Sequence, residues 1–124
     1  SGTILTITIG TGIGTTIQND GDMIPNLEYG RLPHPRMEGS LESHISARSR
    51  KEEKLSLQQW AERFQEGLEF LEHLTKPDMI ILYGGILEHW NTFSGLISSN
   101  VKIEPAQFGA EAGALGAAIA VSKL

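Results

Sequence analysis

The chain has 124 residues, of which 40% are hydrophobic and 20% are charged, a balance typical of one folded domain and not of a disordered tail. It contains no cysteine, which excludes a disulfide scaffold, a thiol nucleophile and a thiolate zinc site. Its net charge of −5 disfavours binding to nucleic acid, and its apolar runs are far shorter than the ~20 residues of a membrane-spanning helix. We therefore expect a cytoplasmic protein that binds neither nucleic acid nor a membrane.

Alternation of apolar and polar residues predicts a β-meander at the start of the chain. A first strand is expected over residues 3–9 and a second over residues 14–19, both rich in β-branched side chains. Asn19-Asp20-Gly21 is a strong signal for a tight turn, because these residues tolerate positive φ. The third strand is expected to be short, from Asp22 to Ile24, and to stop at Pro25.

Residues 26–54 are polar and repeatedly interrupted by proline and glycine, so mostly irregular structure is expected there. A helix is expected to begin near Ser40 and to continue through residues 47–50. Three basic residues of this stretch form a cluster that two glutamates follow directly: Arg48, Arg50 and Lys51. Such a cluster is either a solvated helix face or a contact for a polyanion.

The clearest helix is expected over residues 56–74, where apolar residues recur at helical spacing. Ser56 is the expected N-cap, and Pro77 ends the pattern. The apolar face consists of Leu57, Trp60, Ala61, Phe64, Leu68, Leu71 and Leu74. We expect this face to pack in the core, so Trp60 and Phe64 are interpreted as core residues and not as parts of a site.

Strands and helices alternate in the rest of the chain. The continuous apolar run over residues 79–83 predicts a strand buried on both faces, as in a parallel sheet. After it come Gly84-Gly85, a helix over about 88–99, a short strand over 101–103 that Pro105 breaks, and a small-residue helix over 109–122. A meander followed by this alternation predicts an α/β fold with a mixed sheet and helices packed on it.

A glycine-rich hairpin, Gly10-Thr11-Gly12-Ile13-Gly14-Thr15, is the first candidate site. Phosphate groups need converging N–H donors, which glycine permits by letting the backbone approach, and threonine hydroxyls add further donors. The segment is neither a P-loop, since no lysine precedes Lys51, nor a dinucleotide fingerprint, since Thr15 stands where that pattern has glycine. A phosphate-binding hairpin and a hairpin without a ligand fit the spacing equally well.

Two further segments carry groups suited to ligand binding. The amide of Asn26 and the carboxylate of Glu28 could hydrogen-bond sugar hydroxyls, although an ordinary solvated loop fits residues 25–31 as well. Tyr83-Gly84-Gly85 follows the buried strand at its carboxyl end, where ligands of open α/β sheets bind, and a tight strand-to-helix turn is the equal alternative. No zinc-binding spacing is found among His34, His44, His73 and His89.

Taken in order, these segments resemble the repressor–ORF–kinase (ROK) family of sugar kinases, and most of all its polyphosphate glucokinase branch. The run from Leu5 to Thr15 resembles the second phosphate-binding hairpin of that family, and the run from Asp22 to Gly30 resembles its "vPNxExGH" sugar loop. Further agreement lies in residues 47–50, 55–61, 77–86, 105–106 and 112–118. The resemblance covers nearly the whole chain.

The resemblance implies an actin-like, ribonuclease H-like ATPase fold, of which residues 1–124 would be a single domain, the carboxyl-terminal lobe. In the family the amino-terminal lobe carries the first phosphate loop and the catalytic aspartate. The resemblance therefore implies that this chain has no catalytic residue, is inactive alone and needs a missing amino-terminal lobe. The implied whole enzyme phosphorylates glucose or a similar hexose from ATP, polyphosphate or both, with Mg²⁺.

The family motifs also assign roles to individual residues. Gly10, Thr11, Gly12 and Gly14 would bind phosphates, Gly84 and Gly85 the nucleotide, and Asn26, Glu28 and Arg31 the sugar.

Arg31 departs from the family pattern, because it stands where the family has a sugar-binding histidine. A guanidinium there suits a phosphorylated or acidic ligand, or disables sugar binding. The alternative reading is therefore a non-catalytic pseudokinase or regulatory module that binds a nucleotide, a polyanion or a sugar. Apolar surface left by the missing lobe also suggests self-association as a homodimer.

Overall fold

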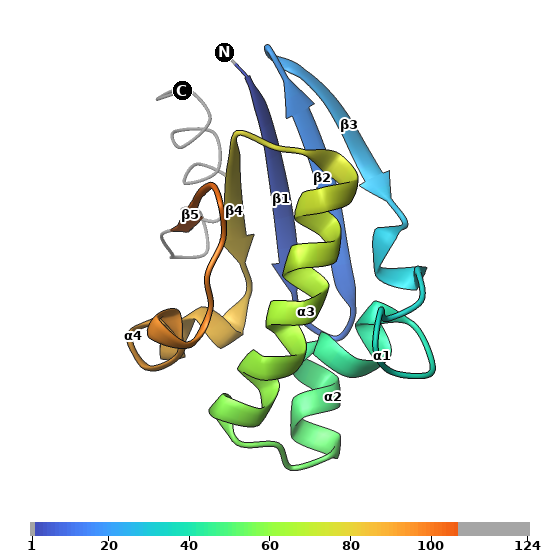
Figure 1. Cartoon of the computed structure of the whole chain (residues 1–124), viewed down its shortest axis with the longest axis vertical. Helices are drawn as coiled ribbons and strands as arrows, with labels where there is room; N and C mark the ends of the chain where they lie inside the picture. Colours follow the sequence, from blue (N-terminus) through green and yellow to red (C-terminus); the bar gives the residue numbers. More distant parts are fainter. Residues whose placement is uncertain (1, 107–124) are drawn as a thin grey trace.

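The computed structural model describes residues 2–106, and its centre is a five-stranded mixed sheet of order β3-β2-β1-β4-β5 (Figure 1). The meander supplies three antiparallel neighbours: β1 (Thr3–Ile9), β2 (Ile13–Asn19) and β3 (Asp22–Leu27). On the other side of β1, β4 (Met79–Tyr83) and β5 (Lys102–Pro105) run parallel to it. The predicted α/β fold with a mixed sheet is confirmed.

The tight turn between β2 and β3 forms where the sequence predicts it. Asp20 and Gly21 both have positive φ, 51° and 93°, as a tight hairpin turn requires. The predicted end of β3 is wrong, because the strand continues through Pro25 to Leu27. Among the described strands β3 pairs only with β2, and an edge strand accepts proline because one side of its backbone needs no partner.

The two faces of the sheet bury different side chains. Leu5, Ile7 and Ile9 of β1 are fully buried in the larger core cluster, together with Ile80 and Leu82 of β4. The opposite face holds a smaller cluster of Ile4, Met79, Ile81 and Ala106. Strand β4 is therefore buried on both faces, as its continuous apolar sequence predicts.

Two short helices, α1 (Leu41–Ile45) and α2 (Ala47–Glu52), replace the single helix expected after Ser40. Ser40 caps α1 by accepting a hydrogen bond from the Ser43 amide. Ser46 separates the helices, because its backbone is extended while its hydroxyl caps α2 through the Ser49 amide. A buried N-cap inside one polar stretch thus breaks the predicted helix in two.

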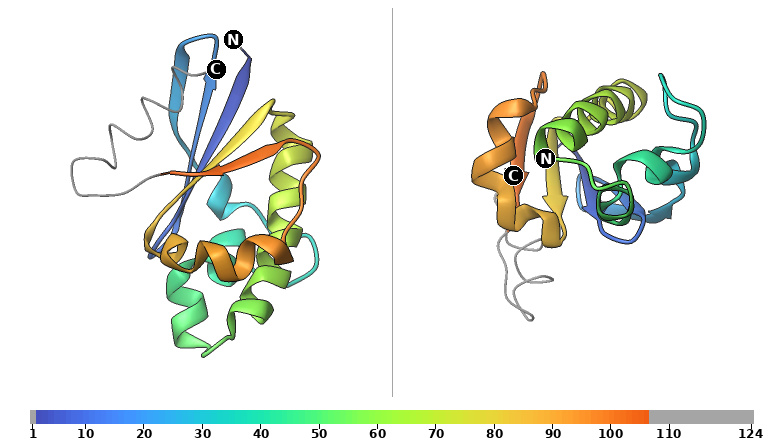
Figure 2. Two further views of the ribbon diagram at one scale, coloured as in Figure 1. Left: turned by 90° about the vertical axis from the view of Figure 1, so that its left-hand side faces the viewer. Right: turned by 90° about the horizontal axis from the view of Figure 1, so that it is seen from below.

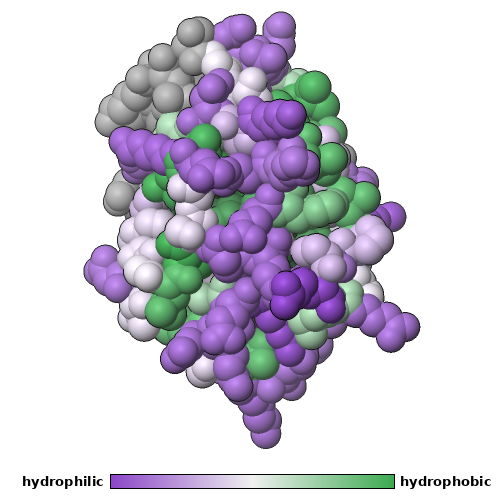
Figure 3. All heavy atoms as spheres, viewed as in Figure 1, coloured by the Kyte–Doolittle hydropathy of each residue, from purple (hydrophilic) through white to green (hydrophobic). Residues whose placement is uncertain are grey.

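Helix α3 (Leu57–Thr75) crosses one face of the sheet and begins with a capping box between Ser56 and Gln59. Trp60 is fully buried, stacks on Phe64 with ring centroids 4.8 Å apart, and donates its indole N–H to the Ile45 carbonyl at 2.8 Å. Both aromatic residues are core residues, as predicted. Hydrophilic side chains cover most of the outer surface over α3 in Figure 3, as an amphipathic helix requires.

Three predicted details of the remaining elements are wrong. Leu74 lies outside the core and is 47% exposed. The helix expected over residues 88–99 is instead the 3₁₀ segment η2 (Gly85–His89), the short helix α4 (Trp90–Phe93) and a second 3₁₀ segment, η3 (Ser94–Leu96). Strand β5 runs over Lys102–Pro105 and not over residues 101–103, so it includes Pro105 as its last residue.

The carboxyl ends of β1 and β4 meet at one end of the sheet. Figures 1 and 2 show α1, α2 and the η2–α4 segment gathered at this end, on either side of the β1–β2 hairpin. A third 3₁₀ segment, η1 (Tyr29–Arg31), contacts β2. The helix predicted over residues 109–122 lies outside the described residues, and none of the helices within residues 2–106 has the length and apolar content that a membrane crossing needs.

Candidate functional site

The predicted phosphate hairpin and the predicted nucleotide glycines lie side by side at this end of the sheet. Parallel pairing of β1 with β4 sets Thr8 level with Tyr83, so Ile9 and Gly84 are the next residues on their strands. Gly84 has a φ of 120°, and a Cβ built on it would be only 2.1 Å from the Ile9 carbonyl oxygen. Only glycine fits there, and its close approach brings the start of η2 against the hairpin.

The hairpin lines a shallow hollow of about 320 Å³, formed by Thr8, residues 10–14 and Glu42. Its backbone amides are divided between internal and free donors. The Gly10 amide donates to the Gly12 carbonyl at 3.0 Å, and the Ile13 amide donates to a Glu42 carboxylate oxygen at 3.2 Å. Within residues 2–106, the amides of Thr11 and Gly12 have no acceptor. Thus Thr11 and Gly12 retain free donors, whereas the Gly10 donor is already used.

Glu42, in the first turn of α1, lines the candidate site, and the sequence alone does not reveal it. Its Oε1 would be 2.7 Å from a Cβ on Gly12 and 3.4 Å from a Cβ on Gly30. The carboxylate therefore lies between the hairpin and the candidate sugar loop. Its position near the start of a helix is a common one for glutamate, and only the packing of α1 reveals that it faces the hairpin.

The candidate sugar loop packs directly on the hairpin strand. Gly30 is buried, and a Cβ there would be 2.6 Å from the Ile13 carbonyl oxygen, so η1 lies against β2 with no space for a side chain. Glu28 and Arg31 flank this contact and pair with each other at 3.2 Å, both largely exposed. Asn26 belongs to β3, and its side chain lies outside the described part of the structure. The structure thus brings the sugar-loop backbone beside the phosphate hairpin.

The chain matches no protein-family model, but it is similar to known proteins in sequence and in structure. It is 33% identical over 121 residues to the polyphosphate glucokinase of Mycobacterium leprae, a match that covers 97% of this chain and 36% of that protein. It is also 33% identical to the inorganic polyphosphate/ATP-glucomannokinase of Arthrobacter sp. strain KM, whose structure superposes with a TM-score of 0.81 over 99% of this chain and 48% of that one. The chain is thus similar in sequence to the polyphosphate glucokinases, and it shares the fold of the ROK sugar kinases.

The fold extends to more distant members of the ROK family. A glucokinase from Streptomyces griseus, solved with glucose and AMPPNP, matches with a TM-score of 0.68 at 16% identity, and covers 98% of this chain and 61% of its own. That likeness concerns the fold alone. The chain spans under half of the length of the Mycobacterium leprae and Arthrobacter relatives.

Two histidines, His34 and His44, have structural roles in the fold. His34 is buried, and its Nδ1 accepts hydrogen bonds from the amides of Arg36 and Met37, both at 3.1 Å. The rings of His34 and His44 meet edge to face at 5.5 Å. Across residues 2–106 no three histidine or acidic side chains gather closely enough to hold a metal ion.

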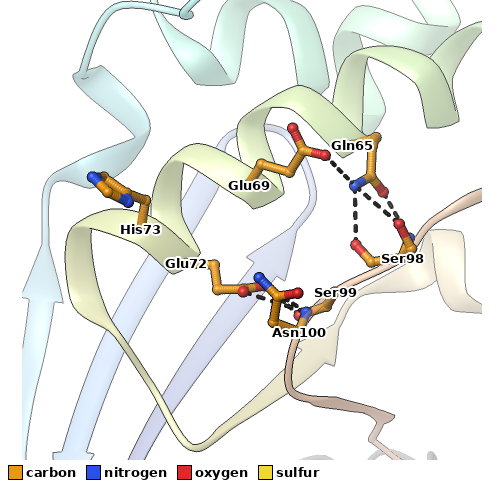
Figure 4. Close-up of a pocket in the computed structure, with 7 residues that line it drawn as sticks. All are labelled: Gln65, Glu69, Glu72, His73, Ser98, Ser99 and Asn100. Atoms are coloured by element: carbon orange, nitrogen blue, oxygen red, sulfur yellow. Dashed lines mark hydrogen bonds between the residues drawn. The ribbon is translucent and has the colours of Figure 1, made fainter.

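A second hollow, of about 520 Å³, lies between α3 and residues 98–100 (Figure 4). Its polar groups bind one another: the Gln65 side chain donates to the Ser98 carbonyl at 3.0 Å and accepts from the Ser98 amide at 2.7 Å. Glu72 accepts hydrogen bonds from the Ser99 hydroxyl and the Asn100 amide. These bonds hold the segment before β5 against α3, so we assign this hollow a structural role.

Proposed function

We propose that this chain is the carboxyl-terminal lobe of a sugar kinase that phosphorylates glucose or a similar hexose from ATP, polyphosphate or both. One observation carries the proposal: the backbones of Gly30 and Gly84 lie directly against one hairpin, at the carbonyl oxygens of Ile13 and Ile9. The candidate sugar loop, phosphate hairpin and nucleotide glycines therefore share one end of the sheet. The names of the relatives, polyphosphate glucokinase and inorganic polyphosphate/ATP-glucomannokinase, support the assignment.

In this proposal the free amides of Thr11 and Gly12 donate hydrogen bonds to the phosphates of the donor. Backbone donors fixed by a β-hairpin stabilise charge without reorganising, which is what phosphoryl transfer needs most from a protein. Gly84 and Gly85 have no side chains, so the approach to the Thr11 and Gly12 amides stays open on the β4 side. Gly85 in particular has no atom within 4 Å of a built Cβ, so its space is available to a ligand.

In the proposed site, carboxylates accept hydrogen bonds from the sugar hydroxyls. Glu28 is exposed at the end of β3, and Glu42 is fixed between the hairpin and Gly30 by the Ile13 amide. Charge-assisted bonds of carboxylates to hydroxyls are roughly twice as strong as neutral ones, and they orient the sugar toward the donor. The general base belongs to the amino-terminal lobe that the family resemblance implies, so this chain alone is expected not to turn over.

Magnesium would enter this site as part of the substrate. Since residues 2–106 offer no cluster of three acidic or histidine ligands, the described residues do not hold the ion by themselves. Mg²⁺ bound to the donor's phosphates neutralises charge on the transferred group, while the hairpin amides orient the same phosphates.

The coding sequence upstream of Ser1 gives the first test. A glycine-rich phosphate loop and an Asn-Asp pair encoded there support the proposal, and a start codon immediately before Ser1 contradicts it. The protein encoded by the whole reading frame should then phosphorylate glucose. Glu28→Gln should raise KM for the sugar about tenfold or more, because it removes a charge-assisted acceptor. Glu62→Gln, an equal change of charge on the exposed side of α3, should leave KM unchanged.

A second candidate function is favoured by the ion pair between Glu28 and Arg31. The 3.2 Å contact engages the carboxylate expected to bind sugar, as it would in a non-catalytic ROK-like module that binds a nucleotide, a polyanion or a sugar. The variant Arg31→His, made in the protein encoded by the whole reading frame, distinguishes the two functions. Turnover by the unmodified protein rules out the module, whereas turnover gained only with Arg31→His supports it.

A further inference from the structure

Helix α2 docks on the phosphate hairpin through its own backbone. The Gly10 carbonyl accepts hydrogen bonds from the amides of Ala47, at 2.9 Å, and Arg48, at 3.3 Å. These bonds fix the start of α2 beside the hollow that the hairpin lines. Arg48 is therefore attached to the candidate phosphate seat, although it is 38 positions away from Gly10 along the chain.

The charge of this segment differs in sign from that of the whole chain. Residues 47–54 carry four basic and two acidic side chains, a net charge of +2 in a chain of net charge −5. Arg48 and Lys51 are three residues apart in α2, so they share one helix face, and both are exposed.

The nearby glutamates compensate this charge only in part. Glu53 is engaged by Arg63 in a two-pronged pair with distances of 2.9 and 3.0 Å, and so points its charge at α3. Glu52 is 3.9 Å from Arg48, with both side chains more than 60% exposed. An exposed pair of that length is weak, and an anion of higher charge can displace the carboxylate from Arg48.

We propose that Arg48 and Lys51 bind phosphates of an inorganic polyphosphate chain beyond the phosphate held at the hairpin. The inference rests on the proposed function, since it extends the hairpin seat along α2. Exposed flexible cations suit a linear polyanion, which presents charge at every phosphate and demands no single geometry. The candidate nucleotide glycines follow β4, where Gly84 contacts Ile9, the residue before Gly10. In the proposed arrangement the three phosphates of a nucleoside triphosphate fill the hairpin site, and only a longer phosphate chain supplies further phosphates to α2.

Direct binding of two probes to the 124-residue chain tests the inference. Calorimetric titration with long-chain inorganic polyphosphate and with triphosphate compares R48Q/K51Q with the control K76N/K102Q, which removes the same charge far from α2. Asn suits position 76 because Lys76 has positive φ there. We expect R48Q/K51Q to weaken polyphosphate binding about tenfold, lower its salt-dependence slope by about two, and leave triphosphate binding within about twofold. Glu52→Gln should strengthen polyphosphate binding.

Two outcomes overturn the inference while the proposed function stands. In the first, R48Q/K51Q and the control bind polyphosphate equally well. In the second, R48Q/K51Q weakens triphosphate and polyphosphate to the same degree, which would leave α2 no separate subsite. Gly12→Asp tests the hairpin itself by placing a negative charge at the seat. If Gly12→Asp leaves triphosphate binding unchanged, the proposed function is contradicted, and the proposed α2 subsite is contradicted as well.

Discussion

The carbonyl of Ile9 occupies the space that a side chain on Gly84 would need. A Cβ built on Gly84 lies 2.1 Å from that oxygen, and the residue has φ 120° and ψ 165°, a conformation essentially restricted to glycine. The contact joins the ends of two parallel strands, β1 and β4, immediately before the hairpin and before η2. One glycine therefore sets how closely the two halves of the candidate donor site approach.

Gly84→Ala should destabilise the chain by about 3 kcal/mol or more, because backbone strain and a clash with backbone act together. Denaturant unfolding followed by tryptophan fluorescence measures the loss. Gly85→Ala is the matched control, since a Cβ at Gly85 meets no atom within 4 Å. It should change stability by less than about 1 kcal/mol. Equal losses for the two variants would show that the Gly84 contact is not the cause.

Glu42 offers a second prediction, because its carboxylate accepts the hydrogen bond of the Ile13 amide. Glu42→Ala should cost about 1–3 kcal/mol by leaving that amide unsatisfied, whereas Glu42→Gln keeps an acceptor and should cost less. Glu42→Gln should also strengthen triphosphate binding, since it removes a negative charge next to Gly12. Unfolding and calorimetric titration of both variants check the prediction, and tighter binding by neither variant contradicts the electrostatic part.

The pair between Glu53 and Arg63 makes stability depend on pH. The hydrogen bonds from the Arg63 guanidinium hold the pKa of Glu53 below its ordinary value of 4.5, against the opposing effect of desolvation. A carboxyl that is more acidic in the folded state stabilises fully above the unfolded pKa and loses that contribution as the pH falls through the folded pKa. Glu53→Gln should therefore be less stable than the unmodified chain near neutral pH, by less than about 1 kcal/mol because the Glu53 side chain is 44% exposed.

On acidification below pH 4.5 the two free energies of unfolding should converge. Denaturant titrations across the acid range provide the measurement. Glu62→Gln removes the same charge from a residue that makes no ion pair among residues 2–106, and its difference from the unmodified chain should stay flat across that range. A Glu53→Gln difference that is also flat would contradict the pKa assignment.

The pattern of apolar and polar residues predicts those elements whose burial follows from their own sequence. It fails where the outcome depends on how an element packs against the rest of the fold. The alternation in residues 3–9 and the apolar run in 79–83 predict β1 and β4 almost to the residue, because the apolar side chains of each strand are the ones that the fold buries. In the sequence, Pro25 and Pro105 indicate the ends of strands, yet both lie within strands that have one described neighbour, where a missing N–H costs little.

The same contrast applies to the candidate site. Its glycines were visible in the sequence, because unusual backbone geometry selects glycine, and Gly30 and Gly84 both prove too close to a carbonyl for a side chain. Glu42 was not visible, since its role depends on how α1 docks on the hairpin. The use of the Gly10 and Ile13 amides within the fold was equally hidden, because hydrogen-bond partners are a property of the tertiary structure.

Ser46 carries the last prediction, because its cap determines where α2 begins. Its buried hydroxyl accepts from the Ser49 amide at 3.1 Å, and the next two amides bind the Gly10 carbonyl. Ser46→Ala should destabilise the chain by about 1–2 kcal/mol, and Ser56→Ala, which removes the cap of α3 at an exposed site, by about 1 kcal/mol. Only Ser46→Ala should speed hydrogen exchange at the Ala47 and Arg48 amides relative to the rest of the chain, because only this cap adjoins the hairpin. Equal protection of those amides in both variants would mean that α2 is held to the hairpin by contacts other than its cap.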